Sequence, residues 1–324
     1  MELANHTGDA VLGKKIGIRA VHSVDRVVFS VPELVAANSF YSDFGLDVVA
    51  ADGKLHLKTF DHPHIWAEII QADVPKRLQF VRFGIFAEDE AYFAKKISDS
   101  GLATTPHPLG SKDSIWLKGP DGFPIQLVVA DKVSPSVRSS PAATAPISPG
   151  AGAASPRSKA PPVRPRHLSH VLLFTPDVHR GVAFYQDVLG LKLSDHSGDG
   201  IAFMHGAHGS DHHLVALAKS HACGLHHLSW NVGSVNEVGL GGEHMKARGH
   251  TQGWGVGRHV LGSNYFYYVR DPWGSWCEYS FDIDHIPASL QWAAQDHPGE
   301  DSFYAWGPPV PADFVTNHEY PAVV

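Results

Sequence analysis

Histidine, tyrosine and glutamate, which can bind a metal or transfer a proton, follow one another at short spacings in the stretch 257–279, GRHVLGSNYFYYVRDPWGSWCEY. His259 precedes Tyr268 by nine residues, and Tyr268 precedes Glu278 by ten. The residues that flank Glu278 are aromatic or apolar, so its carboxylate is expected to be buried. Burying an ionised carboxylate costs several kcal/mol unless it is paired or ligates a metal. The stretch therefore predicts a cation beside Glu278.

Three further strand-like segments carry histidines that could complete a metal site. Of the 23 histidines, 14 lie between His167 and His259, which suggests a site in this half of the chain. The segments are LSHVLLF (168–174), HHLVALA (212–218) and LHHLSWNV (225–232). Strict alternation along a strand predicts which residues share a face with each histidine: Leu172 and Phe174 with His170, Val215 and Leu217 with His213, and Ser229 and Asn231 with His227.

Two histidines and one carboxylate on neighbouring strands form the facial triad that is typical of non-haem Fe(II) enzymes. In this chain the triad would be His170, His227 and Glu278. Three protein ligands leave three adjacent coordination positions, enough for a substrate that binds through two oxygens and for O2. His167 remains an alternative to His170, and His226 remains an alternative to His227.

The elements that must position these residues occur twice along the chain. Residues 25–46 and 169–191 both read as a strand, a proline turn and a helix, and residues 114–129 parallel residues 265–281 around a Pro/Gly turn. Each half therefore reads as a strand, a helix and three further strands. A βαβββ unit of this kind cannot bury its sheet alone. We expect an α+β fold in which two paired units close a curved, eight-stranded, barrel-like sheet around a cavity.

The two copies differ in their ionisable residues. Arg26 aligns with His170, and Gln126 aligns with Glu278, so the candidate ligands occur only in the second copy. A purely structural role would more often be present in both copies, which places the site in the C-terminal half.

A stretch rich in Pro, Ala and Ser, residues 133–166, separates the halves and has no apolar period, which is typical of an extended linker. The predicted organisation is an N-terminal domain without a metal site over residues 1–132, this linker, and a catalytic domain over residues 167–324. The last part of the catalytic domain, rich in aromatic residues and proline, is expected to cap the cavity.

Composition restricts the possible functions. The 324 residues are 43% hydrophobic and 18% charged, which is typical of a soluble globular protein. The net charge of −7 and the lack of a Lys/Arg run argue against a nucleic-acid partner. No apolar run approaches the roughly 20 residues that span a bilayer, and residues 1–19 lack the apolar segment of a signal peptide. Cys223 and Cys277 form no disulfide framework, so we expect a reducing, cytoplasmic setting.

The chain resembles the type I extradiol ring-cleaving dioxygenases of the vicinal oxygen chelate superfamily, which include the catechol 2,3-dioxygenases. The resemblance rests on LSHVLLFTPD, HHLVALA and LHHLSW, and above all on the pattern His259-x8-Tyr268-x9-Glu278. It implies a homo-oligomeric enzyme that inserts both atoms of O2 into a catechol-type aromatic during the breakdown of aromatic compounds. The implied cofactor is Fe(II), with Mn(II) as an alternative.

The resemblance also implies a role for individual residues. It makes His170, His227 and Glu278 the metal ligands, His213 the acid/base, and His259 and Tyr268 the groups that hydrogen-bond the substrate. The gap from His213 to His227 is one residue shorter than the family pattern, so His212 remains an alternative acid/base. We expect further substrate contacts from His212, Trp230, Phe266 and Trp273.

Other interpretations stay open. Glyoxalase-like isomerases and epimerases of the same superfamily act through a metal without O2, but usually draw ligands from both halves. A non-catalytic small-molecule binding module of the same fold would not need the triad. His213 could be a structural histidine, and Tyr268 could serve packing within its aromatic run.

Overall fold

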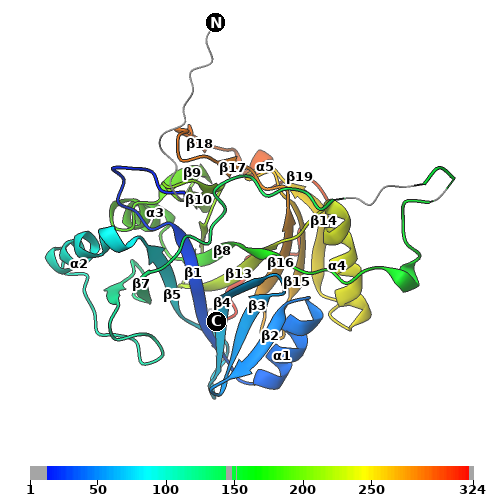
Figure 1. Cartoon of the computed structure of the whole chain (residues 1–324), viewed down its shortest axis with the longest axis horizontal. Coiled ribbons are helices and arrows are strands. Elements are labelled where there is room, and N and C mark those ends of the chain that lie inside the picture. The colour runs from blue at the N-terminus through cyan, green and yellow to red at the C-terminus, as the bar shows by residue number, and fades with distance from the viewer. Residues whose placement is uncertain (1–12, 144–147, 151, 321–324) are drawn as a thin grey trace, which may run out of the picture.

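The computed structural model describes residues 13–143, 148–150 and 152–320, and Figure 1 shows two mixed sheets with helices packed against them. The outer ends of the two predicted domains, and residues 144–147 and 151 of the predicted linker, lie outside the described residues. The expected α+β class is confirmed, since each half builds a sheet and carries its own helices.

The first half forms a seven-stranded sheet in the order β2-β3-β4-β1-β5-β7-β6. Its strands are β1 (Ser23–Val31), β2 (Asp47–Ala51), β3 (Lys54–Thr59), β4 (His62–Gln71), β5 (Arg77–Ile85), β6 (Ile115–Lys118) and β7 (Pro124–Val129). Its helices are α1 (Leu34–Asp43), η1 (Ala87–Asp89) and α2 (Glu90–Asp99).

The second half forms a ten-stranded sheet in the order β18-β9-β10-β12-β8-β13-β16-β15-β14-β19. Its strands are β8 (His167–Thr175), β9 (Lys192–Ser197), β10 (Ile201–His205), β12 (Val215–Lys219), β13 (Gly224–Asn231), β14 (Gly253–His259), β15 (Tyr265–Arg270), β16 (Trp276–Phe281), β18 (Gln295–Asp296) and β19 (Tyr304–Trp306). A separate two-stranded ribbon pairs β11 (Ser210–Asp211) with β17 (His285–Ile286). The helices are α3 (Val178–Asp187), α4 (Val235–Ala247) and the short α5 (Gly299–Ser302).

Each half contains two strand–helix–strand units, and this corrects the single unit per half expected from the sequence. In the second half the first unit runs from β8 to β12, and the second runs from β13 to β16. The first and last strands of each unit pair in parallel. The two units join through the antiparallel pair of β8 and β13, because neither unit can bury its sheet alone. The partner unit therefore comes from the same half of the chain.

The register of the central strands aligns side chains in one row across the second sheet. Ser229 on β13 pairs with His170 on β8 and with Glu278 on β16. Tyr268 on β15 pairs in turn with Glu278. Because neighbouring strands lie about 4.8 Å apart, residues far apart in the sequence meet in this row.

Helix α4 covers the opposite face of the strands that carry Glu278 and Tyr268. It packs on β14, β15 and β16 through a close approach at two glycines. A Cβ on Gly241 would lie 2.7 Å from the ring of Tyr279, and a Cβ on Gly242 would lie 2.7 Å from the ring of Tyr267. Since alternate residues of a strand face opposite ways, burying these two tyrosines under α4 turns Glu278 to the other face.

The two halves share one core. The ring of Tyr279 stacks on Phe44 with centroids 3.8 Å apart, and its hydroxyl donates to the Phe44 carbonyl over 2.8 Å. Lys76 of the first half forms a buried ion pair with Asp271 of the second. These contacts fix the first half against the second sheet.

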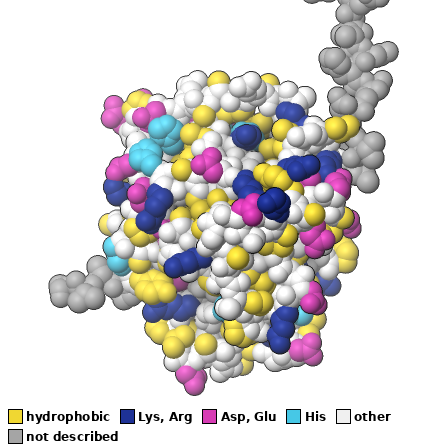
Figure 2. Space-filling view, turned by 90° about the vertical axis from the view of Figure 1, so that its left-hand side faces the viewer, with side chains coloured by type: hydrophobic (Ala, Val, Ile, Leu, Met, Phe, Trp, Pro, Cys, Tyr) yellow, Lys and Arg dark blue, Asp and Glu magenta, His cyan; other side chains and the backbone are white. Residues whose placement is uncertain are grey.

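The described part of residues 137–162 is exposed, apart from Ser139 and Ala142, which are half-buried. In Figure 1 this green segment, with helix η2 (Arg157–Lys159), projects beside α4. Its C-terminal end packs again, because Val163 is buried and the Arg166 N–H donates to the Asn231 carbonyl over 2.8 Å. Acidic and basic side chains are interspersed over the face shown in Figure 2. Among the described residues, none of the helices has the length and apolar character needed to cross a membrane.

Candidate functional site

The three predicted metal ligands converge in the interior of the second half. Nε2 of His170 lies 3.2 Å from Oε2 of Glu278, and Nε2 of His227 lies 3.5 Å from the same oxygen. The two Nε2 atoms are 3.2 Å apart. The strands β8, β13 and β16 supply one ligand each, and all three side chains are at most 2% exposed. Among the described residues, this is the one group of three or more His, Cys, Asp or Glu side chains arranged to hold a metal ion.

The donor atoms fit a divalent cation. Oε2 of Glu278 is buried and has no well-directed hydrogen-bond donor among the described residues. Three atoms that can each offer a lone pair meet here: the Nε2 atoms of His170 and His227, and Oε2 of Glu278. One proton shared between the two nitrogens would leave the carboxylate oxygen without a partner. A buried carboxylate oxygen without a donor is costly. Two imidazoles with one carboxylate are ligands that divalent transition metals accept. The site therefore has the chemistry of a metal centre.

Asn264 orients the carboxylate of Glu278. Its Nδ2 donates to Oε1 of Glu278 and to Oγ of Ser280, each over 3.0 Å. Burial raises the pKa of Glu278, but the neighbouring imidazole of His170 lowers it, and the pKa ends below its ordinary value. Sequence reasoning missed Asn264, because it lies in the loop before β15, where no periodic pattern marks its direction.

His259 and Tyr268 form a hydrogen-bonded pair beside Glu278. Nε2 of His259 lies 2.9 Å from the Tyr268 hydroxyl and 3.9 Å from Oε1 of Glu278. Nδ1 of His259 donates to the carbonyl of Phe303 over 2.8 Å, which leaves Nε2 to accept the phenol proton. Burial raises the pKa of Tyr268 well above its ordinary value, and burial lowers the pKa of His259. Both groups are therefore neutral near pH 7.

His213 packs directly against a candidate ligand. Its ring centroid lies 4.0 Å from that of His170 and 4.8 Å from that of Phe203. Burial, reinforced by the neighbouring histidines, lowers the pKa of His213 well below its ordinary value. His212 lies behind it, with the two Nδ1 atoms 3.1 Å apart.

The prediction that His213 shares a strand face with Val215 and Leu217 is wrong. Val215 and Leu217 belong to the main core, whereas Ala216 and Ala218 lie in a separate apolar cluster with Leu172 and Phe174. Residues 212–214 are irregular and β12 begins only at Val215, so alternation does not extend back to His213. The backbone there turns His213 toward the triad.

The alternative ligands lie outside the triad. Nε2 of His226 is 2.9 Å from the Phe314 carbonyl, although Nδ1 contacts His227. His167 lies near Trp66, with its Nε2 4.0 Å from Asp211.

Three expected substrate contacts do not line the site as predicted. Trp230 is fully buried in the main core, on the face of β13 that points away from His227. Trp273 lies in the turn between β15 and β16 and packs on the same core. Phe266 is fully buried and stacks on His259 with centroids 4.1 Å apart, so it supports that ring. A large aromatic residue in a strand faces either side, and only packing decides which.

The C-terminal segment covers the site from outside. Phe303 and Phe314 join Trp254, Phe266 and Tyr268 in one aromatic cluster. Trp292 lies 5.4 Å from His212, measured between ring centroids, and its indole N–H donates to Asp195 over 3.3 Å. Trp292 also lines a surface hollow of about 490 Å³ with Arg138 and His285. The sequence predicted a capping tail but not which of its residues reach the site.

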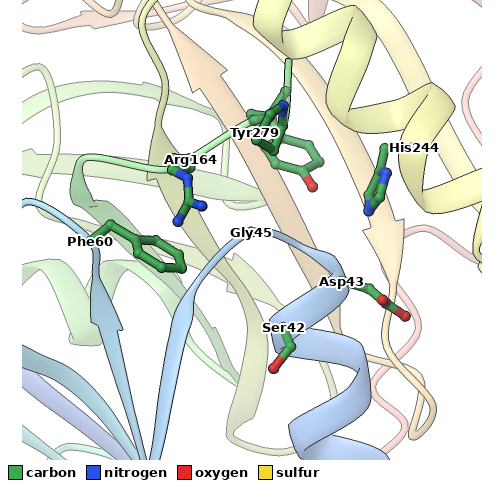
Figure 3. A pocket seen from close by; sticks show the side chains of 9 residues that line it. Ser42, Asp43, Gly45, Phe60, Arg164, His244 and Tyr279 are labelled. Carbon is green, nitrogen blue, oxygen red and sulfur yellow. The ribbon is translucent and has the colours of Figure 1, made fainter. Parts of the chain in front are cut away.

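A second surface pocket, of about 120 Å³, lies between α1 and the end of the linker (Figure 3). Residues that line it include Ser42, Asp43, Gly45, Phe60, Arg164, His244 and Tyr279. Figure 3 shows the guanidinium of Arg164 near the ring of Phe60, 3.5 Å from its centroid. None of the triad residues lines this pocket, so we do not assign the chemistry to it.

Comparisons with known proteins agree with this geometry. Residues 167–279 match the Glyoxalase/Bleomycin resistance protein/Dioxygenase superfamily. The chain is 48% identical over 301 residues to metapyrocatechase 2 of Cupriavidus necator, which covers 93% of each chain. It resembles the Mn(II)-bound glyoxalase from Novosphingobium aromaticivorans with a TM-score of 0.71 and 22% identity, over 91% of this chain and 96% of that one. It resembles a mutant of homoprotocatechuate 2,3-dioxygenase from Brevibacterium fuscum with a TM-score of 0.71 and 18% identity, over 96% and 84%. These two structural matches establish the fold alone.

Proposed function

The chain belongs to the extradiol ring-cleaving dioxygenases of the glyoxalase superfamily, and on that premise we propose that it opens the ring of a catechol-type aromatic beside its two hydroxyls, using O2 and a divalent metal ion. The observation that carries this proposal is the convergence of His170, His227 and Glu278, with Oε2 of Glu278 3.2 Å and 3.5 Å from the two Nε2 atoms. The relative that is 48% identical, a metapyrocatechase by name, supports the same reaction.

We assign His170, His227 and Glu278 as the ligands of Fe(II), with Mn(II) as the alternative, since imidazole and carboxylate suit both ions. When bound, the ion supplies Lewis acidity that lowers the pKa of a coordinated hydroxyl, and a redox path between an electron-rich ring and O2. Asn264 keeps Oε1 of Glu278 engaged, so Oε2 is the oxygen presented to the ion.

His213 is the proposed acid/base. Its neutral ring is buried and lies against His170. A neutral imidazole can take a proton from a substrate hydroxyl and later return it to an oxygen atom that stays in the product as the ring opens. His212 lies behind His213, with its Nδ1 3.1 Å from Nδ1 of His213, and would hold that ring in place.

Tyr268 and His259 would hold one substrate oxygen. The neutral phenol of Tyr268 donates to Nε2 of His259 in the free protein. When the substrate binds, this O–H would turn from His259 to an anionic catecholate oxygen. Hydrogen bonds to charged groups contribute about 1.5–3 kcal/mol. This pair therefore favours the ionised substrate without supplying a charge of its own.

The apolar surface beside His213 suits an aromatic ring. Leu172, Phe174, Ala216 and Ala218 form a buried cluster against which Phe203 packs. Phe203 in turn contacts His213. The enclosed surroundings exclude bulk water, which strengthens each polar contact in the site. We infer a mono- or bicyclic catechol as the substrate class.

The test is O2 uptake with a panel of catechols, after anaerobic loading with Fe(II) or Mn(II) in parallel. We expect stoichiometric O2 consumption and a yellow ring-opened product that absorbs visible light. A glyoxalase-like isomerase would instead convert a thiohemiacetal substrate without consuming O2. Turnover of that substrate, with no O2 uptake on any catechol, would overturn the proposal.

A further inference from the structure

His226 connects a metal-ligand candidate to the C-terminal segment. Its Nδ1 lies 2.7 Å from Nδ1 of His227, and its Nε2 lies 2.9 Å from the carbonyl oxygen of Phe314. The indole N–H of Trp276 donates to the same carbonyl over 3.0 Å. His226 is 2% exposed and Phe314 is 4% exposed, so the chain of contacts is shielded from solvent.

The series of hydrogen bonds from His227 through His226 to Phe314 allows only one arrangement of donors and acceptors. A carbonyl oxygen only accepts, so Nε2 of His226 must carry a hydrogen. Nδ1 of a neutral His226 then carries no hydrogen and accepts through its lone pair. The facing Nδ1 of His227 must therefore donate to it. A neutral His227 that is protonated at Nδ1 has its remaining lone pair on Nε2.

Binding a metal ion would require the same tautomer of His227. Nε2 is the atom of His227 that faces His170 and Glu278, at 3.2 Å and 3.5 Å. A metal ligand needs its lone pair there, and the other ring nitrogen of a ligating histidine ordinarily donates to a neighbouring acceptor. Most such acceptors are carboxylates, carbonyls or waters. Here the acceptor is a second histidine, itself oriented by the backbone.

We propose that His226 is a positioning residue that holds His227 in its Nδ1–H tautomer. The Phe314 carbonyl, which can only accept, sets the direction of both hydrogen bonds. The C-terminal segment thereby prepares the metal site, although it supplies no ligand. This inference rests on the proposed ligand role of His227. Outer partners of metal ligands typically change metal affinity about 10–100-fold when removed, and we expect an effect of that size.

A purely structural role for His226 has a different consequence. If His226 only anchors the C-terminal segment, its bond to Phe314 matters and its bond to His227 does not. Two amide side chains separate these cases. The amide of Asn reaches the position of the imidazole Nδ1, where its oxygen can accept from His227. The amide of Gln reaches the position of Nε2, where its NH2 can donate to Phe314.

The experiment measures Mn(II) affinity of the full-length protein without substrate, by the electron paramagnetic resonance signal of the free ion. The variants are His226→Asn, His226→Gln and His226→Phe, with Glu278→Gln as the reference for a lost ligand. We expect His226→Asn to stay within about threefold of wild type, and both other variants to lose about 10–100-fold. Equal affinities for the Asn and Gln variants, or a stronger loss for Asn, would overturn the inference.

A second measurement uses only the wild type, so it does not depend on whether the variants fold. The metal-free wild type is labelled with 15N at its histidine rings, and the tautomers are identified by NMR. We expect His227 to be protonated at Nδ1 and His226 at Nε2, whereas the reverse for either ring contradicts the proposal. If the wild type binds no Mn(II), or Glu278→Gln binds it equally well, the ligand assignment itself fails, and this outcome differs from a failure of His226 alone.

Discussion

Nε2 of His212 lies 2.9 Å from Oδ2 of Asp195, while its Nδ1 lies 3.1 Å from Nδ1 of His213. Burial raises the pKa of Asp195, but hydrogen bonds from His212, the Gln295 N–H and His297 bring it below its ordinary value. An ionised carboxylate only accepts, so His212 donates through Nε2 and offers Nδ1 to His213. His213 then carries its hydrogen on Nδ1, and its Nε2 keeps a lone pair that can accept a proton, as a base requires.

The first prediction separates the two adjacent histidines. His213→Phe should keep Mn(II) binding and lower kcat by about 10²–10⁴-fold, because the acid/base is lost. His212→Phe should lower kcat by only about tenfold, since it orients His213 without reaching the triad. The measurement is kcat for catechol cleavage together with Mn(II) affinity. A dead His212→Phe enzyme beside an active His213→Phe enzyme would reverse the assignment, and loss of metal in both would place the pair among the ligands.

The second prediction concerns the carboxylate ligand. Glu278→Gln keeps the size of the side chain but removes its charge, so the affinity for Fe(II) or Mn(II) should fall by more than about 100-fold. Glu68→Gln is the matched control, because Glu68 is also a buried carboxylate but pairs with Arg26 and Lys54 of the first half. Metal content of both purified variants is measured by elemental analysis. A full equivalent of metal in Glu278→Gln would refute the ligand assignment.

The third prediction tests the hydrogen bond from Tyr268. Tyr268→Phe removes a donor aimed at His259 and should lower kcat/KM by about 10–100-fold, the equivalent of about 1.5–3 kcal/mol. Tyr267→Phe is the control one residue away, since that ring lies under α4 on the opposite face. Steady-state kinetics on both variants give the result. Equal losses would mean that Tyr268 acts through packing rather than through its hydroxyl.

The fourth prediction concerns the joint between the halves. Lys76→Met leaves Asp271 buried without its cation and should lower the free energy of unfolding by about 3–5 kcal/mol. Lys95→Met breaks an exposed pair with Asp99 and should cost less than about 1 kcal/mol. Urea denaturation of both variants provides the comparison. A similar small loss for both would show that the buried pair does not stabilise the joint.

The fifth prediction concerns the exposed linker. Removing about ten residues between 148 and 162 should leave kcat within about twofold, because exposed loop segments tolerate such changes. The linker contact between Arg157 and Glu243 is at the surface and contributes about 0–1 kcal/mol. Turnover and thermal unfolding are compared with the full-length chain. A large loss of activity in a folded variant would show that the linker takes part in the site.

Several features follow from the sequence alone. The spacing His259-x8-Tyr268-x9-Glu278 spans three consecutive antiparallel strands, β14, β15 and β16, and its three side chains lie beside one another. The single copy of the ionisable set placed the candidate metal site in the second half, and the triad residues do converge there. These inferences hold because they depend on local periodicity and on comparison within one chain.

Tertiary packing decided the rest. His213 faces the triad because residues 212–214 leave the strand, and Trp230 faces away because the main core takes its ring. The pairing of two units depends on the antiparallel contact of β1 with β5 in the first half and of β8 with β13 in the second, between segments far apart in the sequence. The orientation of His226 and His259 depends on the carbonyls of Phe314 and Phe303. Every residue has a carbonyl, so side-chain identity does not reveal which carbonyl a histidine will meet, and only the folded path of the chain selects it.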